Sequence, residues 1–349
     1  MDTVTHALSG ALLACATAPV RDRPGELPLR TRIAAGFAAA SFPDIDLALR
    51  LIDTLTYLNW HQGPTHSLVL LPGWAWLLAH AFARVDRRGH RWQAFFVPAA
   101  LGLAIHIAGD LVTAYGLMPW APLSTRRFAL PWVFVIDPWV TAILAFGLAL
   151  ALWRPAPQGV AAAALAVLAG YVMVLAGLHA QALRAGRAHV LAGGLESATV
   201  HALPQPLSPL HWKIIVRSGS EQRVAHIRLP APLGTAAVEP PGRLLRRIHA
   251  AYRPPATAPW VDLAHFGHGP DAALAREAWN APAFEPFRRF AVFPAVDGID
   301  RAGEAACVWF VDLRFTLPAV APSFRFGACR DALTRAWQLR RSRGAWWID

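Results

Sequence analysis

The residues most capable of chemistry are a histidine and an aspartate inside a long apolar run. His106 and Asp110 lie four positions apart in the segment 101–113. On a helix, that spacing places both side chains on one face, and Thr113 lies close to the same stripe. Ionisable groups are costly in such surroundings. The pair therefore predicts either a hydrogen bond across one helical turn or a site shared with other segments.

Three further segments carry the same side-chain types. His6 begins the apolar run 4–18, the sequence Phe-Pro-Asp-Ile-Asp occupies 42–46, and His-Gln-Gly-Pro-Thr-His-Ser occupies 61–67. Taken singly, each has a structural explanation: a core histidine, a helix cap, a loop with a following helical turn. Taken together, they supply histidine and carboxylate, which zinc and similar divalent ions prefer. The predicted metal ligands are His6, Asp44, Asp46, His61, His66, His106 and Asp110.

The composition predicts a membrane protein in the first half of the chain. Of 349 residues, 55% are hydrophobic and 16% are charged, whereas a soluble domain is typically about 25% charged. Long apolar runs at 68–85, 92–117, 138–153 and 158–183 predict a membrane-embedded helical bundle over residues 1–187, in contact with the lipid bilayer. Residues 188–349 predict a soluble α+β domain, with strands at 211–217, 222–229 and 306–317 and a helix at 270–280. The fold class is mainly α.

Arginine placement predicts the topology of the bundle. The connections 20–32, 84–91 and around 154 carry most of the short-loop arginines and should be cytoplasmic. If successive apolar runs cross the membrane in alternating directions, every candidate ligand and the C-terminal domain lie at the extracytoplasmic face of a multi-pass protein. The formal charge of +11 does not indicate nucleic acid, because the basic residues are scattered among apolar runs. The cysteines show no metal-binding spacing and allow at most one disulfide, between Cys307 and Cys329.

Four ordered motifs resemble those of a known family. They are Met-Asp-Thr-Val-Thr-His at 1–6, the motifs at 42–46 and 61–67, and His-x-x-x-Asp-x-x-Thr-x-x-Gly at 106–116. Over roughly residues 1–150 the chain looks like the YdjM/YfhP family of bacterial inner-membrane proteins, regarded as metal-dependent hydrolases. Gln62 stands where the family commonly has an arginine. The family in turn is distantly similar to zinc-dependent phospholipase C and the S1/P1 nucleases, and here the ligands suffice for one or two ions.

The resemblance implies metal-assisted hydrolysis of a phosphoester or lipid-like substrate, with zinc as the expected cofactor. We expect His6, His66, His106 and Asp110 to bind the ion. Asp44 or Asp46 would bridge two ions or act as a base, and His61 would be a ligand or a proton donor. Side chains expected to orient the imidazoles are Ser67, Thr113 and Asp137.

Two other functions compete with hydrolysis. A membrane transporter would use the histidines and aspartates to move ions or protons, and it would need a polar path across the bilayer. A scaffold would only anchor the C-terminal domain, which would then carry the activity. That domain is rich in histidine, but His265-x-x-His268 is its nearest approach to a ligand motif.

Overall fold

The computed structural model describes residues 1–20, 25–195, 197–230, 242–303, 305–331 and 334–342. Its contacts divide the chain into two compact units, Met1–Ala176 and Gly177–Asp349. The division falls inside one long helix, and the boundary predicted after residue 187 lies in the same helix. Each unit is described by itself below.

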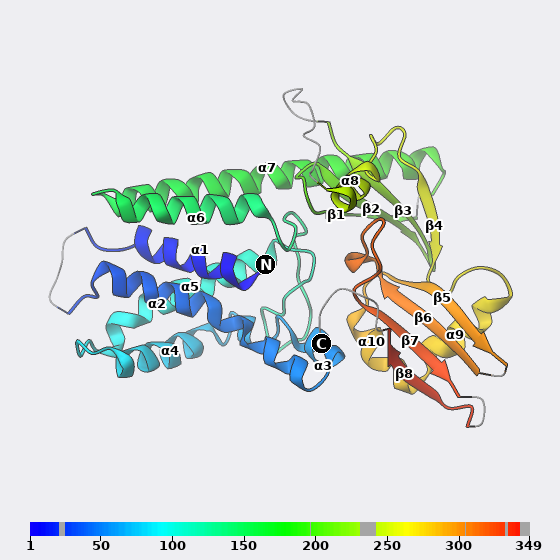
Figure 1. The fold of residues 1–349 in the computed structure, drawn as a ribbon, viewed down its shortest axis with the longest axis horizontal. Helices are drawn as coiled ribbons and strands as arrows, with labels where there is room; N and C mark the ends of the chain where they lie inside the picture. Colours follow the sequence, from blue (N-terminus) through cyan, green and yellow to red (C-terminus); the bar gives the residue numbers. More distant parts are fainter. Residues whose placement is uncertain (21–24, 196, 231–241, 304, 332–333, 343–349) are drawn as a thin grey trace. The chain divides into compact units, whose positions relative to one another are not determined.

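The first unit is a bundle of helices that run alongside one another (Figure 1). α1 lies against α2, α5 and α6, while α5 also lies against α2 and α4. Short 3-10 helices follow α2 and α3. The elements are α1 (Thr3–Ala16), α2 (Leu29–Ser41), η1 (Phe42–Leu51), α3 (Thr54–Trp60), η2 (Pro64–His66), α4 (Leu71–Val85), α5 (Trp92–Leu111), α6 (Pro138–Trp153) and α7 (Pro157–Ala192), whose first part belongs to this unit.

Neighbouring helices of the bundle alternate in direction, so their connections gather at two ends. The end of α1, the start of α2, the end of α4, the start of α5 and the junction of α6 with α7 lie at one end of the bundle, together with Arg30, Arg84, Arg91 and Arg154 (Figure 1). The start of α1, the end of α2, the start of α4 and the end of α5 lie at the other. All the predicted ligands therefore belong to a single end of the bundle, as the threading of the sequence required.

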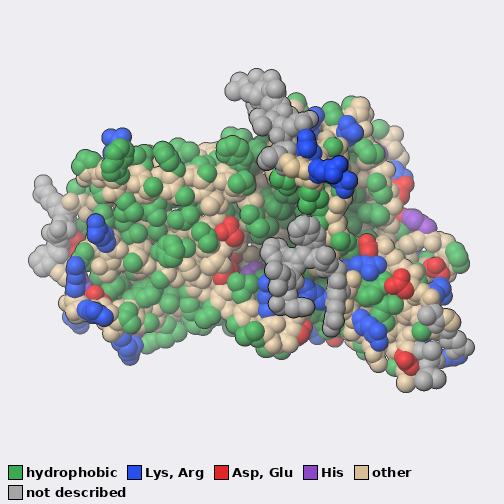
Figure 2. Space-filling model, in the orientation of Figure 1, with side chains coloured by type: hydrophobic (Ala, Val, Ile, Leu, Met, Phe, Trp, Pro, Cys, Tyr) green, Lys and Arg blue, Asp and Glu red, His purple; other side chains and the backbone are tan. Residues whose placement is uncertain are grey.

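The bundle has the surface of a membrane protein. Among the described residues, α5 and α7 are long and apolar enough to cross a membrane, and the bent pair Thr54–His66 and Leu71–Val85 adds a third candidate. Large apolar side chains such as Phe37, Phe146 and Met173 are exposed. Figure 2 shows hydrophobic side chains covering the visible face of the bundle, with arginine side chains near the end where α1, α4 and α6 finish. Such an apolar surface is stable in contact with lipid.

Three glycines bring α1, α2 and α5 into backbone contact. A Cβ placed on Gly10 would lie 2.3 Å from the Gly36 oxygen, and one placed on Gly102 would lie 2.7 Å from the same oxygen. No side chain fits at those separations. Small residues at helix crossings allow this close approach, which favours van der Waals contact where no hydrophobic effect drives helices together. The glycines thus fix the spacing of the two helices that carry His6, His106 and Asp110 and of the helix that leads into Asp44 and Asp46.

The second unit contains two antiparallel four-stranded sheets, β1-β2-β3-β4 and β5-β6-β7-β8. Buried aromatic and aliphatic side chains, among them Trp212, Phe284 and Phe310, form its core. Its strands are β1 (Thr199–Pro204), β2 (His211–Ser218), β3 (Glu221–Arg228), β4 (Trp260–Ala264), β5 (Pro294–Ala302), β6 (Ala305–Asp312), β7 (Arg325–Arg330) and β8 (Trp337–Arg341). Its helices beyond α7 are α8 (Arg243–Ala250), η3 (Gly269–Asp271), α9 (Ala272–Asn280), η4 (Pro282–Phe284), α10 (Glu285–Phe290) and η5 (Leu313–Phe315). The predicted α+β class is confirmed.

A buried lysine joins β2 to the turn that follows β6. Lys213 on β2 is fully buried, and its Nζ donates to the Leu313 carbonyl at 2.7 Å and to the Thr316 hydroxyl at 2.8 Å. Burial lowers the pKa of the Lys213 ammonium to about 7, because a desolvated charge is disfavoured. The predicted disulfide between Cys307 and Cys329 is also present, between directly paired positions of β6 and β7.

Two predicted elements end earlier than the sequence suggested. The strand expected over 306–317 stops at Asp312, because its carboxylate accepts hydrogen bonds from the backbone N–H groups of Val292 and Arg314 and turns the chain into η5. The helix expected over 92–117 ends at Leu111. Beyond it the chain is extended enough for Leu117 to pair with Phe128. Apolar runs continue past both ends, so hydropathy alone overestimated the lengths.

We expect Gly36→Ala to destabilise the bundle, because its methyl group would lie 2.5 Å from the Gly10 oxygen. Overpacking of this kind typically costs about 1–3 kcal/mol, which should lower the thermal midpoint of the detergent-solubilised protein by several degrees. The control is Gly170→Ala on α7, where nothing lies within 4 Å of an added Cβ. That substitution should leave the midpoint unchanged or raise it slightly, since alanine favours helix. Equal midpoints for the two variants would contradict the proposed contact.

Candidate metal centre

Each candidate ligand is positioned by the start or the end of a helix. Asp2 caps α1 and sets its first turn, so that His6 faces the interior. Pro43 begins η1 directly after α2, which places Asp44 and Asp46 at the junction. Pro64 similarly begins η2, which ends at His66. Proline suits a first helical turn because its fixed φ is already helical.

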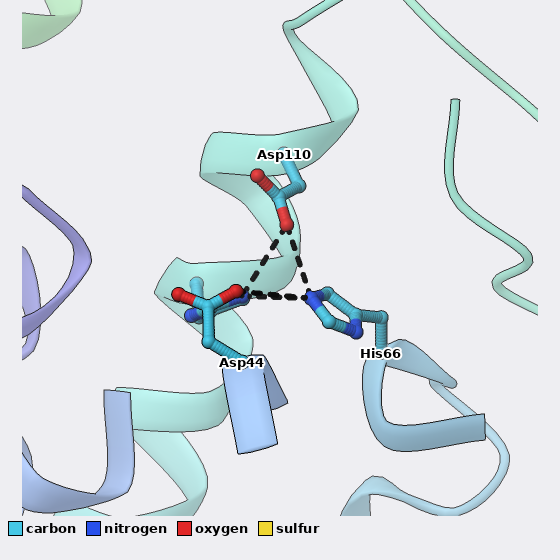
Figure 3. A group of neighbouring side chains, drawn as sticks. Asp44, His66 and Asp110 are labelled. Carbon is cyan, nitrogen blue, oxygen red and sulfur yellow. Dashed lines mark hydrogen bonds and ion pairs between the residues drawn. The ribbon is translucent and has the colours of Figure 1, made fainter. Parts of the chain in front are cut away.

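Four of these side chains converge in the interior. Asp44, His66, His106 and Asp110 are all buried and offer ligand atoms that lie within 4.8 Å of one another. His66 Nε2 lies 2.9 Å from His106 Nε2 and 3.1 Å from Asp110 Oδ2. Figure 3 shows the carboxylates of Asp44 and Asp110 and the ring of His66 pointing toward one another. The pair that drew attention in the sequence thus belongs to a larger group and is not a closed hydrogen bond.

The second nitrogen of each central histidine faces oxygen. His106 Nδ1 lies 2.6 Å from the Ala40 carbonyl, so this nitrogen must donate. His66 Nδ1 lies 3.0 Å from the Thr65 hydroxyl and 3.5 Å from an Asp46 oxygen. In a neutral imidazole one nitrogen carries the proton and the other a lone pair. The Nε2 atom of His106 therefore presents a lone pair toward the group, and the surroundings of His66 favour the same tautomer.

The donor set fits a divalent cation. Asp110 Oδ2 is buried and makes no hydrogen bond among the described residues, although two imidazole nitrogens lie within 3.3 Å of it. Lone pairs on nitrogen and oxygen that face one another repel unless a proton or a cation lies among them. Two imidazoles and two carboxylates form a nitrogen–oxygen set that suits zinc. Partners on the far side of each imidazole, such as the Ala40 carbonyl, commonly orient metal-binding histidines.

A second group adjoins the first through a shared carboxylate. Asp44, Asp46 and His61 also bring ligand atoms within 4.8 Å of one another. His61 Nδ1 lies 2.8 Å from Asp46 Oδ1, and the backbone N–H of Gln62 donates to Asp46 Oδ2. Burial by itself would raise the pKa of the Asp46 carboxyl, but its hydrogen bonds and the histidine charges outweigh burial and lower it. Asp46 is therefore a carboxylate at neutral pH.

His6 and His61 border the four-residue group on different sides. His6 stacks on His106 with ring centroids 3.6 Å apart, and its Nε2 lies 3.1 Å from Asp110 Oδ1. The amino group of Met1 pairs with the same oxygen. His61 is packed between the rings of Tyr57 and Tyr115, but 13% of its side chain remains exposed. All the predicted ligands thus lie together, with His61 nearest to solvent.

The residues that support the ligands are mostly not those predicted. The Ser67 hydroxyl donates to the carbonyls of Pro119 and Ala121, and the Thr113 hydroxyl donates to the Asp110 carbonyl. Asp137 caps α6 and accepts a hydrogen bond from Tyr171. The prediction that these three side chains orient the imidazoles was therefore wrong, because each is used by the backbone or by another helix.

Thr3 and Thr65 hold the site instead. The Thr3 hydroxyl donates to Asp44 Oδ2 at 2.6 Å, and the Thr65 hydroxyl contacts both His66 and Asp46. Both residues lie within the quoted motifs at 1–6 and 61–67, which was the only signal available in the sequence. Gln62, where the family commonly has arginine, is 2% exposed and adopts a positive φ of 59°. Its contribution to the site is its backbone N–H.

The comparisons with known proteins agree with the bundle. The model of the YdjM inner membrane protein family matches residues 1–182, which is just over half of the chain. This protein belongs to the YdjM family. The uncharacterized protein YfhP of Bacillus subtilis is 29% identical over 158 residues, which cover 44% of this chain and 46% of YfhP. The matched part therefore spans less than half the length of that relative.

The search of solved structures found no significant match. The distant likeness to zinc-dependent phospholipase C and the S1/P1 nucleases accordingly stays a prediction. Within the described residues, both groups of possible metal ligands lie in the bundle. In the second unit, His265 stacks on Phe266, and His268 lies 3.8 Å from Glu221.

Metal analysis of the purified protein tests the centre. We expect His106→Ala to lower metal affinity by at least about tenfold, since changes beside metal sites already have effects of that size. The matched control is His90→Ala, because His90 pairs with Asp86 at the same four-residue spacing in a connection at the other end of the bundle. Elemental analysis after gel filtration measures the bound metal. Full retention of metal in His106→Ala would contradict the centre.

Proposed function

We propose that this membrane protein is a metal-dependent hydrolase of phosphoesters. The observation that carries the proposal is the buried group of Asp44, His66, His106 and Asp110, together with the adjoining group that shares Asp44. A divalent ion in such a site, most suitably zinc, lowers the pKa of a bound water and polarises a phosphoryl oxygen. Phosphoesters fit best, because two neighbouring cation positions match the charge of a phosphoryl group.

The side chains of this protein have distinct roles in the proposal. His66, His106 and Asp110 would hold the ion, with His6 beside them. Asp44 belongs to both groups and is suited to bridge two ions or to act as a base. Asp46 fixes the orientation of His61 through the 2.8 Å contact with Nδ1. The partly exposed His61 can then exchange a proton with solvent and deliver it to the leaving group, if it is not itself a ligand.

The interior of the bundle favours hydrolysis over transport. A transporter needs polar groups that continue across the membrane. Apart from the Ser9 hydroxyl, the buried side chains that the structure describes on α1, α2 and α5 between the candidate centre and the end that carries the arginines are small or apolar, and they include Ala11, Leu12, Ala14, Ala35, Ala39, Ala99 and Leu103. A site at one end of the bundle, next to the membrane surface, suits a lipid-like substrate. The scaffold alternative predicts that the activity belongs to the second unit and does not need the candidate centre.

The hydrolase proposal is tested on the purified protein in nanodiscs. We expect release of product from a soluble nitrophenyl phosphodiester and from phospholipid vesicles, and we expect a chelator to abolish both. His61→Ala should lower kcat by about 100-fold, which is the usual contribution of a positioned proton donor. His90→Ala should retain full activity. Hydrolysis that survives complete metal removal would exclude this mechanism.

We further propose that the candidate centre and the second unit lie on the extracytoplasmic side of the bacterial inner membrane, in a multi-pass arrangement. The arginine-bearing connections support a cytoplasmic location for the other end of the bundle. The disulfide between Cys307 and Cys329 supports an oxidising compartment for the second unit.

Thiol labelling in intact cells tests this orientation. In a Cys15→Ala background, which removes the buried free cysteine, a membrane-impermeant reductant followed by an impermeant maleimide should label Cys307 and Cys329 without lysis. The control omits the reductant and should show no labelling, because the two thiols are then joined. Labelling that appears only after lysis would place the second unit in the cytoplasm.

A further inference from the structure

An apolar pocket lies within the bundle beside the candidate centre. It has a volume of about 360 Å³ and is bordered by α1, α5, α6 and α7, all within the first unit. Aliphatic side chains form nearly all of its wall, including Ala108, Leu144, Leu168, Ala169 and Met173. Two of the helices that border it, α5 and α7, are those long and apolar enough to cross a membrane. Met173, Ala108 and Ala169 line the pocket and are exposed, so the pocket opens on the apolar surface of the bundle.

The pocket and the candidate centre share a wall. His6 lines the pocket, while its ring stacks on His106 and its Nε2 contacts Asp110. Gly109 lines the pocket next to Asp110, and an added Cβ there would lie 3.2 Å from His6 Cε1. The absence of a side chain at Gly109 keeps the space beside the His6 ring open. A molecule that filled the pocket would thus end at the ligand group.

The two hydroxyl groups at the pocket are already hydrogen-bonded. The Thr5 hydroxyl contacts Asp2 and Thr141, and the Ser9 hydroxyl donates to the His6 carbonyl. A polar ligand would leave water without gaining hydrogen bonds in return, which is unfavourable. A hydrocarbon chain carries no such cost, and each methylene removed from water raises affinity by about fourfold. The chemistry of the wall selects an aliphatic chain.

We propose that this pocket binds the hydrocarbon chain of the substrate, so that the substrate class is a lipid phosphoester held with its phosphoryl group at the candidate centre. This inference rests on the proposed hydrolase function for the position of the reacting group. The partly exposed His61 then faces the aqueous side of the centre, and His6 faces the chain. Water and lipid reach the same ligand group from different sides.

Selectivity between two substrates tests the pocket. Nitrophenyl phosphodiesters that carry either a methyl or a hexadecyl group are hydrolysed by the metal-loaded protein in nanodiscs. Ala169→Phe and Ala108→Phe should each lower the ratio of hexadecyl to methyl kcat/KM by about tenfold, since a ring in the pocket displaces at least two methylenes. The control is Ala166→Phe, an exposed alanine of α7 outside the pocket. Its ratio should equal that of the unmodified protein.

A binding measurement separates failure of the pocket from failure of the hydrolase. A hexadecyl phosphonate with a photoreactive diazirine in its chain cannot turn over, and it should label α5 and α7 at the pocket in the unmodified protein and in Ala166→Phe. Labelling should fall in Ala169→Phe. Pocket labelling without hydrolysis of either ester would overturn the hydrolase alone. Unchanged labelling and an unchanged substrate ratio in both pocket variants would overturn the pocket.

Discussion

Two carboxylates and two imidazoles are crowded together away from water, and the rest of the bundle is arranged around this crowding. Asp44, His66, His106 and Asp110 are each less than 9% exposed, and Asp110 Oδ2 makes no hydrogen bond among the described residues. Like charges and facing lone pairs at such separations repel strongly in a medium of low dielectric constant. The arrangement is understandable when a cation neutralises it. The oxygen atoms that face the outer nitrogens of the two histidines hold the protons there, which leaves the lone pairs of the inner nitrogens for the cation.

Precise helix packing is the condition for such a group. The ligands come from α1, from the junction after α2, from the turn before α4 and from the end of α5, so no single element fixes them. The backbone contacts at Gly10, Gly36 and Gly102 set the distances among three of these helices. A shift of one helix would alter the distances from its own side chains to all the other candidate ligands. The packing of the helices therefore determines the geometry of the candidate ligands.

Much of this organisation could be predicted from the sequence, because apolar runs, short-loop arginines and motif spacing are local signals. The candidate ligands could be named from the sequence because histidine and aspartate are conspicuous in an apolar chain, and the structure brings them together. The helix end at Leu111 was missed because hydrophobicity continues to Leu117. The supporting contacts of Thr3, Thr65 and the Ala40 carbonyl were also missed, because they depend on tertiary distances. Proximity in the sequence predicted that Ser67 and Thr113 orient imidazole rings. In the structure their hydroxyls donate hydrogen bonds to backbone carbonyls instead.

The burial of Lys213 has a consequence for the surface of the whole chain. It is the only lysine in the sequence, and its side chain is fully buried in the second unit. All other side-chain cations besides histidine are therefore guanidinium groups, which keep their charge at any pH a protein meets. The positive charge at the connections of the bundle is consequently insensitive to alkalinity. Reagents and enzymes that modify lysine side chains would find no accessible target on this protein.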